Sequence, residues 1–293
     1  MTAPPSAARV TEIHHGTLVS TDVLAAHLHD ARWAIVDCRF NLDDVEAGER
    51  AYLEAHVPGA VSAHLDRHLS GPRTGRNGRH PLPSPEQMSA TFGKLGLERD
   101  LQIAVYDQGP GMYAARLWWM LRYLGHDAVA VVDGGFAKWV AEGRPVRAKG
   151  ESRPPRRFEG APRRGMLALA GELEQHLADP TLRLIDARSP ERYRGEVEPL
   201  DPVAGHIPGA VNHHYQQNLG EDGTFLPAGE LKRRLAPLLG DEPASRAVCY
   251  CGSGVTACHN LLAMAHAGLG LGRLYAGSWS EWCADPARPV AHG

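Results

Sequence analysis

The sequence predicts an α/β protein of two tandem domains, each a parallel sheet flanked by helices. The chain has 293 residues, more than one hydrophobic core usually organises, so two domains of roughly 140 residues each are expected. Its two halves repeat several motifs in the same order. Within each half, short apolar runs alternate with helical segments, a pattern typical of parallel sheets that are covered on both faces.

The internal repeat decides the architecture, because four matches keep their order and nearly the same spacing. Three of them pair an apolar run with a second apolar run, and one pairs a His-Val/Ile-Pro-Gly-Ala turn with its copy. The matches join 35–39 to 184–188, 55–61 to 205–211, 103–107 to 247–251, and 131–139 to 274–282. We therefore expect one domain over 1–147 and a second over 166–293.

The elements follow from the apolar runs. In the first half, strands are expected at 34–37 and 128–133, and a helix at 112–124. In the second half, strands are expected at 183–186, 247–250 and 273–275, and a helix at 256–267. Reactive groups in such sheets lie beyond the carboxyl ends of strands. Asp107 and Cys251 both occupy that position.

The segment 148–165 joins the two halves. It contains Pro154, Pro155, Pro162 and several arginines, with no apolar periodicity. We expect an extended linker on the surface.

Composition excludes several classes of function. A net charge of −3 argues against a surface for nucleic acid or anionic lipid. No signal peptide is visible, and no run approaches the ~18 apolar residues of a membrane span. Five cysteines without a CxxC pair argue against a zinc site and fit a reduced cytosol. We expect a cytoplasmic protein with no metal and no cofactor.

Cys251 is the candidate nucleophile. It ends an apolar strand and enters a loop of Gly252, Ser253, Gly254 and Val255 that leads through Thr256 into a helix. Glycines let such a loop curl so that its N–H groups point inward and bind an anion, with help from the helix N-terminus. We expect this cradle to lower the pKa of the thiol. An isolated cysteine at a strand end is more often a small buried hydrophobe.

The repeat and the loop together resemble the two-domain rhodanese superfamily, from about residue 18 to residue 289. The similarity includes Gly-His-Ile-Pro-Gly-Ala, the closing Gly-Ser-Trp-x-Glu-Trp, and Cys-Gly-Ser-Gly-Val-Thr-Ala at 251–257. This loop is most similar to that of 3-mercaptopyruvate sulfurtransferases, whereas thiosulfate sulfurtransferases typically carry Arg-Lys after the cysteine. The resemblance implies two rhodanese-type domains, the first without catalytic function because Asp107 replaces the cysteine. It also implies an active site between the domains.

The resemblance also implies an activity. A small-molecule donor passes a sulfane sulfur to Cys251, giving a persulfide, and a thiol such as thioredoxin, or cyanide, accepts it. Ser253 is expected to contact the reacting sulfur or relay a proton together with His80 and Asp66 of the first half. We expect the pKa of His80 to lie near neutrality, which suits proton transfer.

Arginines are expected to hold the donor. Arg192 matches a family position that grips the donor's anionic group, and a guanidinium can hold a carboxylate with two hydrogen bonds. The family's second arginine is missing here, where Leu200 follows an acidic-Pro step. Arg194 is the nearest candidate to replace it. The loop backbone of Gly252, Gly254, Val255 and Thr256 completes the predicted binding site.

Three alternatives remain at this stage. A cysteine phosphatase needs an arginine at the far end of the loop, where this chain has Ala257. A sulfur carrier or binding module without activity fits Asp107 but not Cys251 and Ser253. Thiosulfate remains the alternative donor. A chain that already pairs two domains is expected to be a monomer.

Overall fold

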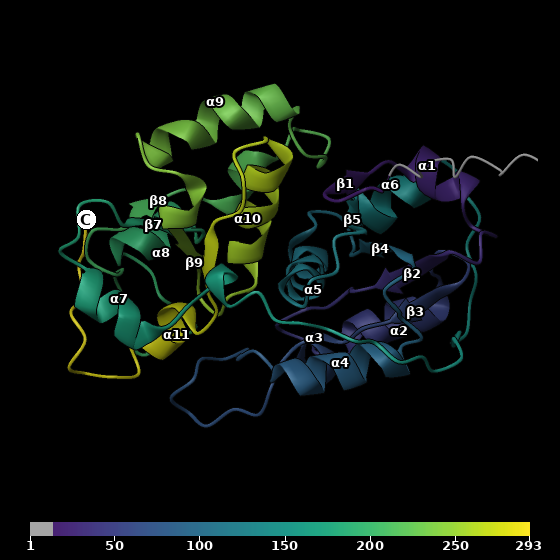
Figure 1. Cartoon of the computed structure of the whole chain (residues 1–293), viewed down its shortest axis with the longest axis horizontal. Helices are drawn as coiled ribbons and strands as arrows, with labels where there is room; N and C mark the ends of the chain where they lie inside the picture. Colours follow the sequence, from purple (N-terminus) through teal and green to yellow (C-terminus); the bar gives the residue numbers. More distant parts are fainter. Residues whose placement is uncertain (1–13) are drawn as a thin grey trace, which may run out of the picture.

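The computed structural model describes residues 14–293 and contains two five-stranded sheets, both parallel throughout. The first has the order β1-β5-β4-β2-β3 and the second the order β6-β10-β9-β7-β8. The two orders correspond strand by strand, and helices flank both sheets (Figure 1). The predicted fold class is therefore confirmed.

The first half contains five strands and six α-helices among its described residues. They are β1 (Leu18–Val19), α1 (Thr21–Ala26), β2 (Trp33–Asp37), α2 (Ala47–Glu54), β3 (Ala60–Ser62), α3 (Leu65–His68), α4 (Pro85–Lys94), β4 (Gln102–Tyr106), α5 (Met112–Tyr123), β5 (Val129–Val132) and α6 (Gly135–Ala141).

The second half contains the matching strands, five α-helices and three short 3₁₀ turns. They are η1 (Arg164–Met166), β6 (Leu167–Ala168), α7 (Ala170–His176), β7 (Arg183–Asp186), α8 (Pro190–Arg194), β8 (Val211–Asn212), η2 (Tyr215–Asn218), α9 (Ala228–Leu239), η3 (Ala244–Arg246), β9 (Ala247–Tyr250), α10 (Thr256–His266), β10 (Arg273–Tyr275) and α11 (Ser278–Trp282).

The predicted elements exist with bounds that are the same or differ by one residue. β7, β9 and β10 have the predicted bounds, while α5 and α10 each end one residue early. The strands that the sequence did not indicate, β1, β3, β6 and β8, are the edge strands of the two sheets and have only two or three residues. Runs that short carry no readable periodicity.

The two halves meet through α5 and α10, which lie side by side between the sheets (Figure 1). Every residue from Tyr113 to Leu121 in α5 and from Ala257 to Met264 in α10 is buried. A helix that is apolar on all sides is buried on all sides. One hydrophobic cluster includes residues of both helices, so the halves share a core.

The repeated Asp-x-Arg motif forms the same buried ion pair in each half. Arg39 lies 2.7 Å from Asp37, and Arg188 lies 2.6 Å from Asp186. Each arginine also donates to a backbone carbonyl of the segment before the His-Val/Ile-Pro-Gly turn, at Ala55 and Gly205 respectively. The pair therefore fastens the turn to the carboxyl end of β2 in the first half and of β7 in the second.

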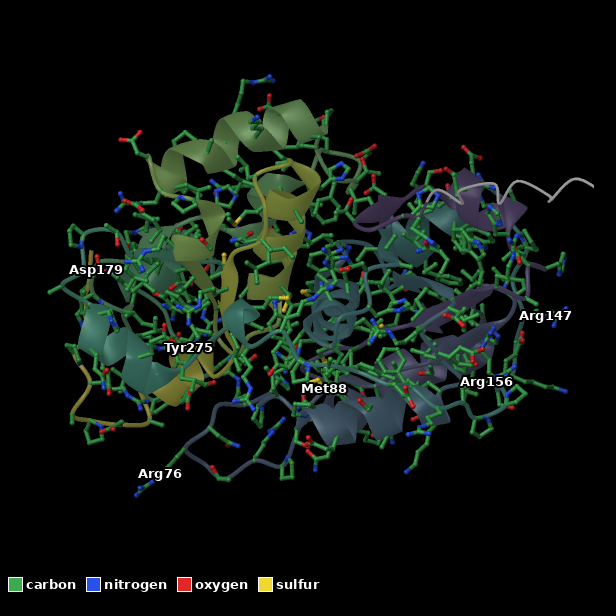
Figure 2. All side chains as sticks on the ribbon, viewed as in Figure 1. Arg76, Met88, Arg147, Arg156, Asp179 and Tyr275 are labelled. Carbon is green, nitrogen blue, oxygen red and sulfur yellow. The ribbon has the colours of Figure 1, made fainter. Side chains whose placement is uncertain are left out.

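The segment 148–163 has no helix or strand and runs along the first half. It is not a free spacer, because Phe158 is buried and packs edge-on against Phe92 at 5.5 Å between ring centres. The Arg156 N–H also donates to the Gly93 carbonyl at 2.8 Å. The Arg156 side chain points outward, like Arg147 and Arg76 (Figure 2).

No helix within residues 14–293 has the length and apolarity to cross a membrane. All five cysteines are free and buried. Their reactivity therefore depends on the local surroundings of each thiol.

Candidate active site

Cys251 lies at the carboxyl end of β9, 2% exposed, with its sulfur facing the loop that follows. The Gly254 N–H donates to Cys251 Sγ at 3.1 Å. Gly254 has a left-handed φ of +75°, and a Cβ there would collide with the Ala276 carbonyl oxygen. Glycine is therefore required at position 254 for its N–H to reach the sulfur. The loop is also held by the N-terminus of α11, where the Trp279 N–H donates to the Cys251 carbonyl at 2.9 Å.

The neighbouring thiols are held in the acid form. Burial raises the pKa of Cys258 to about 12, and burial also raises the pKa of Cys249. Cys258 Sγ donates to the Gly254 carbonyl at 3.3 Å and so supports the loop. Neither residue lines the pocket described below.

The first half carries the same loop, filled by its own carboxylate. Asp107 is buried, and its oxygens accept from the backbone N–H groups of Gly109, Gly111, Tyr113 and Ala114 at 2.9–3.3 Å. Burial raises the pKa of Asp107, while these four N–H groups act against that shift. The cradle expected for an anion thus exists in the first half, already occupied.

Ser253, His80 and Asp66 form a connected series across the two halves. The Ser253 hydroxyl lies 2.8 Å from His80 Nδ1, and His80 Nε2 lies 3.4 Å from Asp66 Oδ1. An ionised carboxylate only accepts hydrogen bonds, so Asp66 favours the tautomer with hydrogen on Nε2. His80 Nδ1 then accepts from the Ser253 hydroxyl.

The expected near-neutral pKa of His80 is wrong. Burial lowers the pKa of His80 to about 3, with further lowering from Arg116, Arg73 and Arg79. The imidazole is therefore uncharged at neutral pH. It acts as a fixed hydrogen-bond acceptor rather than as a group that is half protonated.

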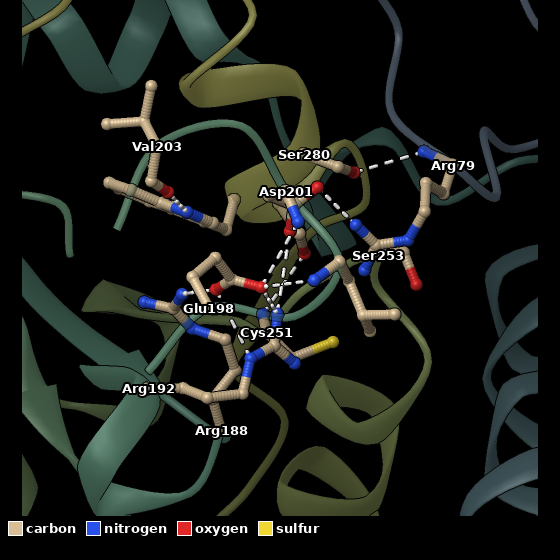
Figure 3. Close-up of polar contacts among 12 residues, drawn as sticks. Arg79, Arg188, Arg192, Glu198, Asp201, Val203, Cys251, Ser253 and Ser280 are labelled. Carbon is tan, nitrogen blue, oxygen red and sulfur yellow. Dashed lines mark hydrogen bonds and ion pairs between the residues drawn. The ribbon is translucent and has the colours of Figure 1, made fainter. Parts of the chain in front are cut away.

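Two arginines meet above Gly252, the residue after the nucleophile. A Cβ on Gly252 would lie 2.8 Å from Arg79 Nη2 and 3.4 Å from Arg192 Nη1. Arg79 reaches this position because its N–H donates to Ser280 Oγ at 3.0 Å, which docks its loop on α11 (Figure 3). Arg192 comes from α8.

Two carboxylates hold these arginines in place. Glu198 Oε1 accepts from Arg192 Nη2 at 2.6 Å, and Glu198 Oε2 lies 3.2 Å from Arg188 Nη1. Asp201 pairs with Arg79 and lies 3.5 Å from Arg192 (Figure 3).

A pocket of about 230 Å³ lies between the two halves, directly above the loop. Most of its wall is apolar, and its polar groups gather at the loop and the arginines. It is lined by Leu42, Arg79, His80, Met112, Tyr113, Ala187, Arg188, Ser189, Arg192, Leu200, His214, Tyr215, Cys251, Gly252, Ser253, Val255 and Thr256.

Comparison with known proteins agrees with this geometry. The family model for the rhodanese-like domain matches the chain twice, over residues 20–142 and 169–285. The chain belongs to the rhodanese family. It is 50% identical to a probable 3-mercaptopyruvate sulfurtransferase of Pseudomonas aeruginosa, over 94% of this chain and 98% of that protein.

Two other rhodanese relatives differ in the donor that their names give. The chain is 39% identical to a putative thiosulfate sulfurtransferase of Mycobacterium tuberculosis, over 89% of this chain and 91% of that protein. The crystal structure of a 3-mercaptopyruvate sulfurtransferase from Escherichia coli superposes with a TM-score of 0.79 at 31% identity, covering 90% of this chain and 99% of that chain.

The structure brings most of the predicted rhodanese site together. Seven of the predicted residues line the pocket. Two others contact these residues: Gly254 donates its N–H to the Cys251 sulfur, and Asp66 lies 3.4 Å from His80 Nε2. The seven are Cys251, Ser253, His80, Arg192, Gly252, Val255 and Thr256. Among the described residues, no group of three or more His, Cys, Asp or Glu side chains is placed to hold a metal ion.

Arg194 is not brought to the pocket, which corrects the prediction for this residue. It pairs with Glu196 at 2.7 Å on the exposed side of α8. Residues two apart on a helix face different sides, so α8 cannot present both Arg192 and Arg194 to the donor. Arg79, which lines the pocket as Leu200 does, supplies the guanidinium that Arg194 was expected to supply.

Sequence reasoning missed Arg79, Asp201 and Arg116. Arg116 of α5 is fully buried, and it donates to the carbonyls of Gly254 and His80 at 3.0 and 2.9 Å. Burial lowers the pKa of Arg116, while the nearby thiols of Cys258 and Cys251 act against that shift. An arginine within the apolar run of α5 was a usable signal, because an arginine is rarely fully buried unless it is paired.

Proposed function

We propose that this protein is a sulfurtransferase that moves a sulfane sulfur from 3-mercaptopyruvate to a thiol or to cyanide through a persulfide on Cys251. The observation that carries the proposal is the pocket between the halves. There a cysteine loop, a Ser253–His80–Asp66 series and two guanidinium groups converge. The 50% identity to a probable 3-mercaptopyruvate sulfurtransferase supports the choice of donor.

Arg79 and Arg192 bind the carboxylate of the donor above Gly252. Their nitrogen atoms lie within contact distance of one position there, which suits the two oxygens of a carboxylate. The thiol of 3-mercaptopyruvate, at the other end of the molecule, then points toward Cys251 and Ser253. The apolar wall of the pocket excludes water from the reacting atoms.

Sulfur transfer conserves atoms and charge. The Cys251 thiolate attacks the donor sulfur, the carbon–sulfur bond breaks, and its electron pair forms the enolate of pyruvate. The Ser253 oxygen, oriented by His80, accepts the proton of the donor thiol while the hydroxyl proton of Ser253 passes to the enolate carbon, so the hydroxyl group ends unchanged. The products are pyruvate and a Cys251 persulfide anion, which the loop N–H groups stabilise.

In the second step the outer sulfur of the persulfide passes to the acceptor. Cyanide attacks the outer sulfur of the persulfide, leaves as thiocyanate and regenerates the Cys251 thiolate. A thiol such as that of thioredoxin accepts the same sulfur as its own persulfide. The pocket opens between the two halves and so leaves a path for either acceptor.

We also propose the domain bounds, the oligomeric state and the cellular location of this enzyme. The chain divides into domains at 1–147 and 166–293 with 148–165 as the linker, and it acts as a monomer because both halves of the site come from one chain. A cytoplasmic location suits five free cysteines.

Replacing Cys251 by Ser is expected to abolish turnover with every donor, because the nucleophile is lost. Thiocyanate release from 3-mercaptopyruvate plus cyanide, and a mass gain of one sulfur atom on the enzyme, provide the measurements. Cys283→Ala is the control, since Cys283 packs in a separate cluster away from the pocket. A Cys251→Ser protein that still releases thiocyanate refutes the proposal.

Thiosulfate is the second candidate donor, supported by the name of the Mycobacterium tuberculosis relative. Comparing kcat/KM for both donors on one preparation decides between them. We expect 3-mercaptopyruvate to be preferred, and a strong preference for thiosulfate reverses the choice of donor while keeping the class of reaction.

A further inference from the structure

Asp201 contacts Arg79 and Arg192, two of the three arginines that line the pocket. One of its oxygens pairs with Arg79 Nη1, and the other lies 3.5 Å from Arg192 Nη2. The Asp201 side chain is 4% exposed, compared with 24% for Arg79 and 18% for Arg192. Asp201 is therefore a nearly buried carboxylate that bridges an arginine of the first half to one of the second (Figure 3).

Glu198, the other carboxylate here, is fully engaged by the protein itself. Its Oε1 accepts from the N–H groups of Leu200 at 3.1 Å and Asp201 at 3.2 Å, in addition to Arg192. Its Oε2 is shared between Arg192 and Arg188. Glu198 thus shapes the loop as well as holding Arg192.

The charges of this cluster cancel. Asp186 balances Arg188, and Glu198 and Asp201 together balance Arg192 and Arg79. The two guanidinium groups offer directed N–H donors to an incoming anion, but almost no surplus positive charge. An anion with one negative charge can be bound by hydrogen bonds alone, whereas a second negative charge has no counterpart among these six side chains.

We infer that Asp201 sets the charge of the donor that the pocket accepts, favouring a monocarboxylate thiol over a dianion such as thiosulfate. This inference rests on the proposed function, because it concerns the donor of the same site. Coulomb energy is proportional to the product of the charges. A fixed carboxylate therefore repels a dianion with twice the energy with which it repels a monoanion. Because affinity depends exponentially on energy, the factor by which the carboxylate weakens dianion binding is the square of the factor for a monoanion.

Asp201→Asn removes the charge and keeps the size of the side chain. We expect KM to fall about threefold for 3-mercaptopyruvate and about tenfold for thiosulfate, as the charge product requires. The kcat for 3-mercaptopyruvate is expected to change little, because Asp201 does not touch the reacting atoms. The ratio of kcat/KM for thiosulfate over that for 3-mercaptopyruvate then rises about threefold.

Glu196→Gln is the matched control. It removes the same charge from the same loop, but Glu196 pairs with the exposed Arg194 rather than with a pocket arginine. We expect the donor ratio of this variant to equal that of the parent protein. Equal donor ratios in Asp201→Asn and Glu196→Gln overturn the inference. Asp201→Ser makes the same charge change if the Asn variant does not fold.

Alkylation of Cys251 tests the charge effect without any turnover. Iodoacetate carries one negative charge and iodoacetamide none, so the ratio of their rates at Cys251 reports the potential in the pocket. Asp201→Asn is expected to raise this ratio about threefold, an effect that added salt reduces. An unchanged ratio overturns the inference even in an active enzyme. A raised ratio in a protein that transfers sulfur from neither donor supports the inference and rejects the proposed function.

Discussion

Ser253 and His80 come from different halves of the molecule and meet through one hydrogen bond of 2.8 Å. His80 is 2% exposed and uncharged at neutral pH, because burial and the surrounding arginines lower its pKa to about 3. A neutral imidazole held by Asp66 gives the Ser253 hydroxyl a defined direction. Ser253 lines the pocket, where in the proposed mechanism its oxygen exchanges a proton with the donor.

Ser253→Ala is expected to impair 3-mercaptopyruvate turnover far more than thiosulfate turnover. Cleavage of 3-mercaptopyruvate moves a proton from sulfur to carbon, whereas thiosulfate releases sulfite without such a transfer. We expect kcat/KM for 3-mercaptopyruvate to fall about a hundredfold, the usual scale of a lost proton relay. Parallel assays with the two donors provide the measurement. Ser89→Ala on α4 is the control, and equal losses with both donors remove the special role of Ser253.

The loop between β9 and α10 shows how a short element positions the reacting atoms. Its conformation depends on Gly254, whose backbone packs against the carbonyl of Ala276. Its outer carbonyls are held by the first turn of α11, at Trp279 and Ser280. The loop is thus fixed on both sides before any donor arrives, which is the condition for electrostatic stabilisation without reorganisation.

Gly254→Ala is expected to lose activity and to cost more stability than the left-handed conformation alone explains. The conformation costs about 1–2 kcal/mol for a residue with a Cβ, and the collision with Ala276 adds to it. Gly209→Ala is the matched control, because Gly209 has φ +81° with open space around it. Urea denaturation and kcat/KM of the two variants provide the comparison. Similar losses in both contradict the role given to the packing at Gly254.

At the scale of the whole molecule, a hydrogen bond of a buried histidine joins the two halves in addition to the apolar contacts of α5 and α10. His259 of α10 lies 2.8 Å from the Pro110 carbonyl in the loop after β4. Its other nitrogen lies 3.1 Å from Asn218 Nδ2. A carbonyl only accepts, so Nε2 carries the hydrogen and Nδ1 accepts from Asn218. Protonation of His259 would break the contact with Asn218.

Stability is expected to decrease as the pH falls below about 6.5. Burial lowers the pKa of both His80 and His259 to about 3, while the unfolded chain keeps the ordinary value near 6.5. The unfolded state therefore binds more protons between these values. The free energy of unfolding then falls by up to about 1.4 kcal/mol per pH unit for each histidine.

Urea denaturation between pH 7 and pH 4.5 measures this dependence, with His29→Gln as a control at an exposed site. In a proton NMR titration from pH 8 to pH 5, at least two histidine signals are expected to stay in place. Stability that is flat over this range, or histidines that all titrate near 6.5, contradicts the assignment.

The sequence by itself determined the fold class and the duplication and indicated Cys251 as the candidate nucleophile, because these depend on patterns that are local in the chain. Strand runs, the Gly-rich loop after Cys251 and the exchange of cysteine for Asp107 can all be read within a few residues. Tertiary structure alone decided that Arg79 rather than Arg194 lines the pocket, and that Asp201 pairs with Arg79. It also decided that His80 is uncharged, since burial and charges from distant segments set both effects and no local pattern records them.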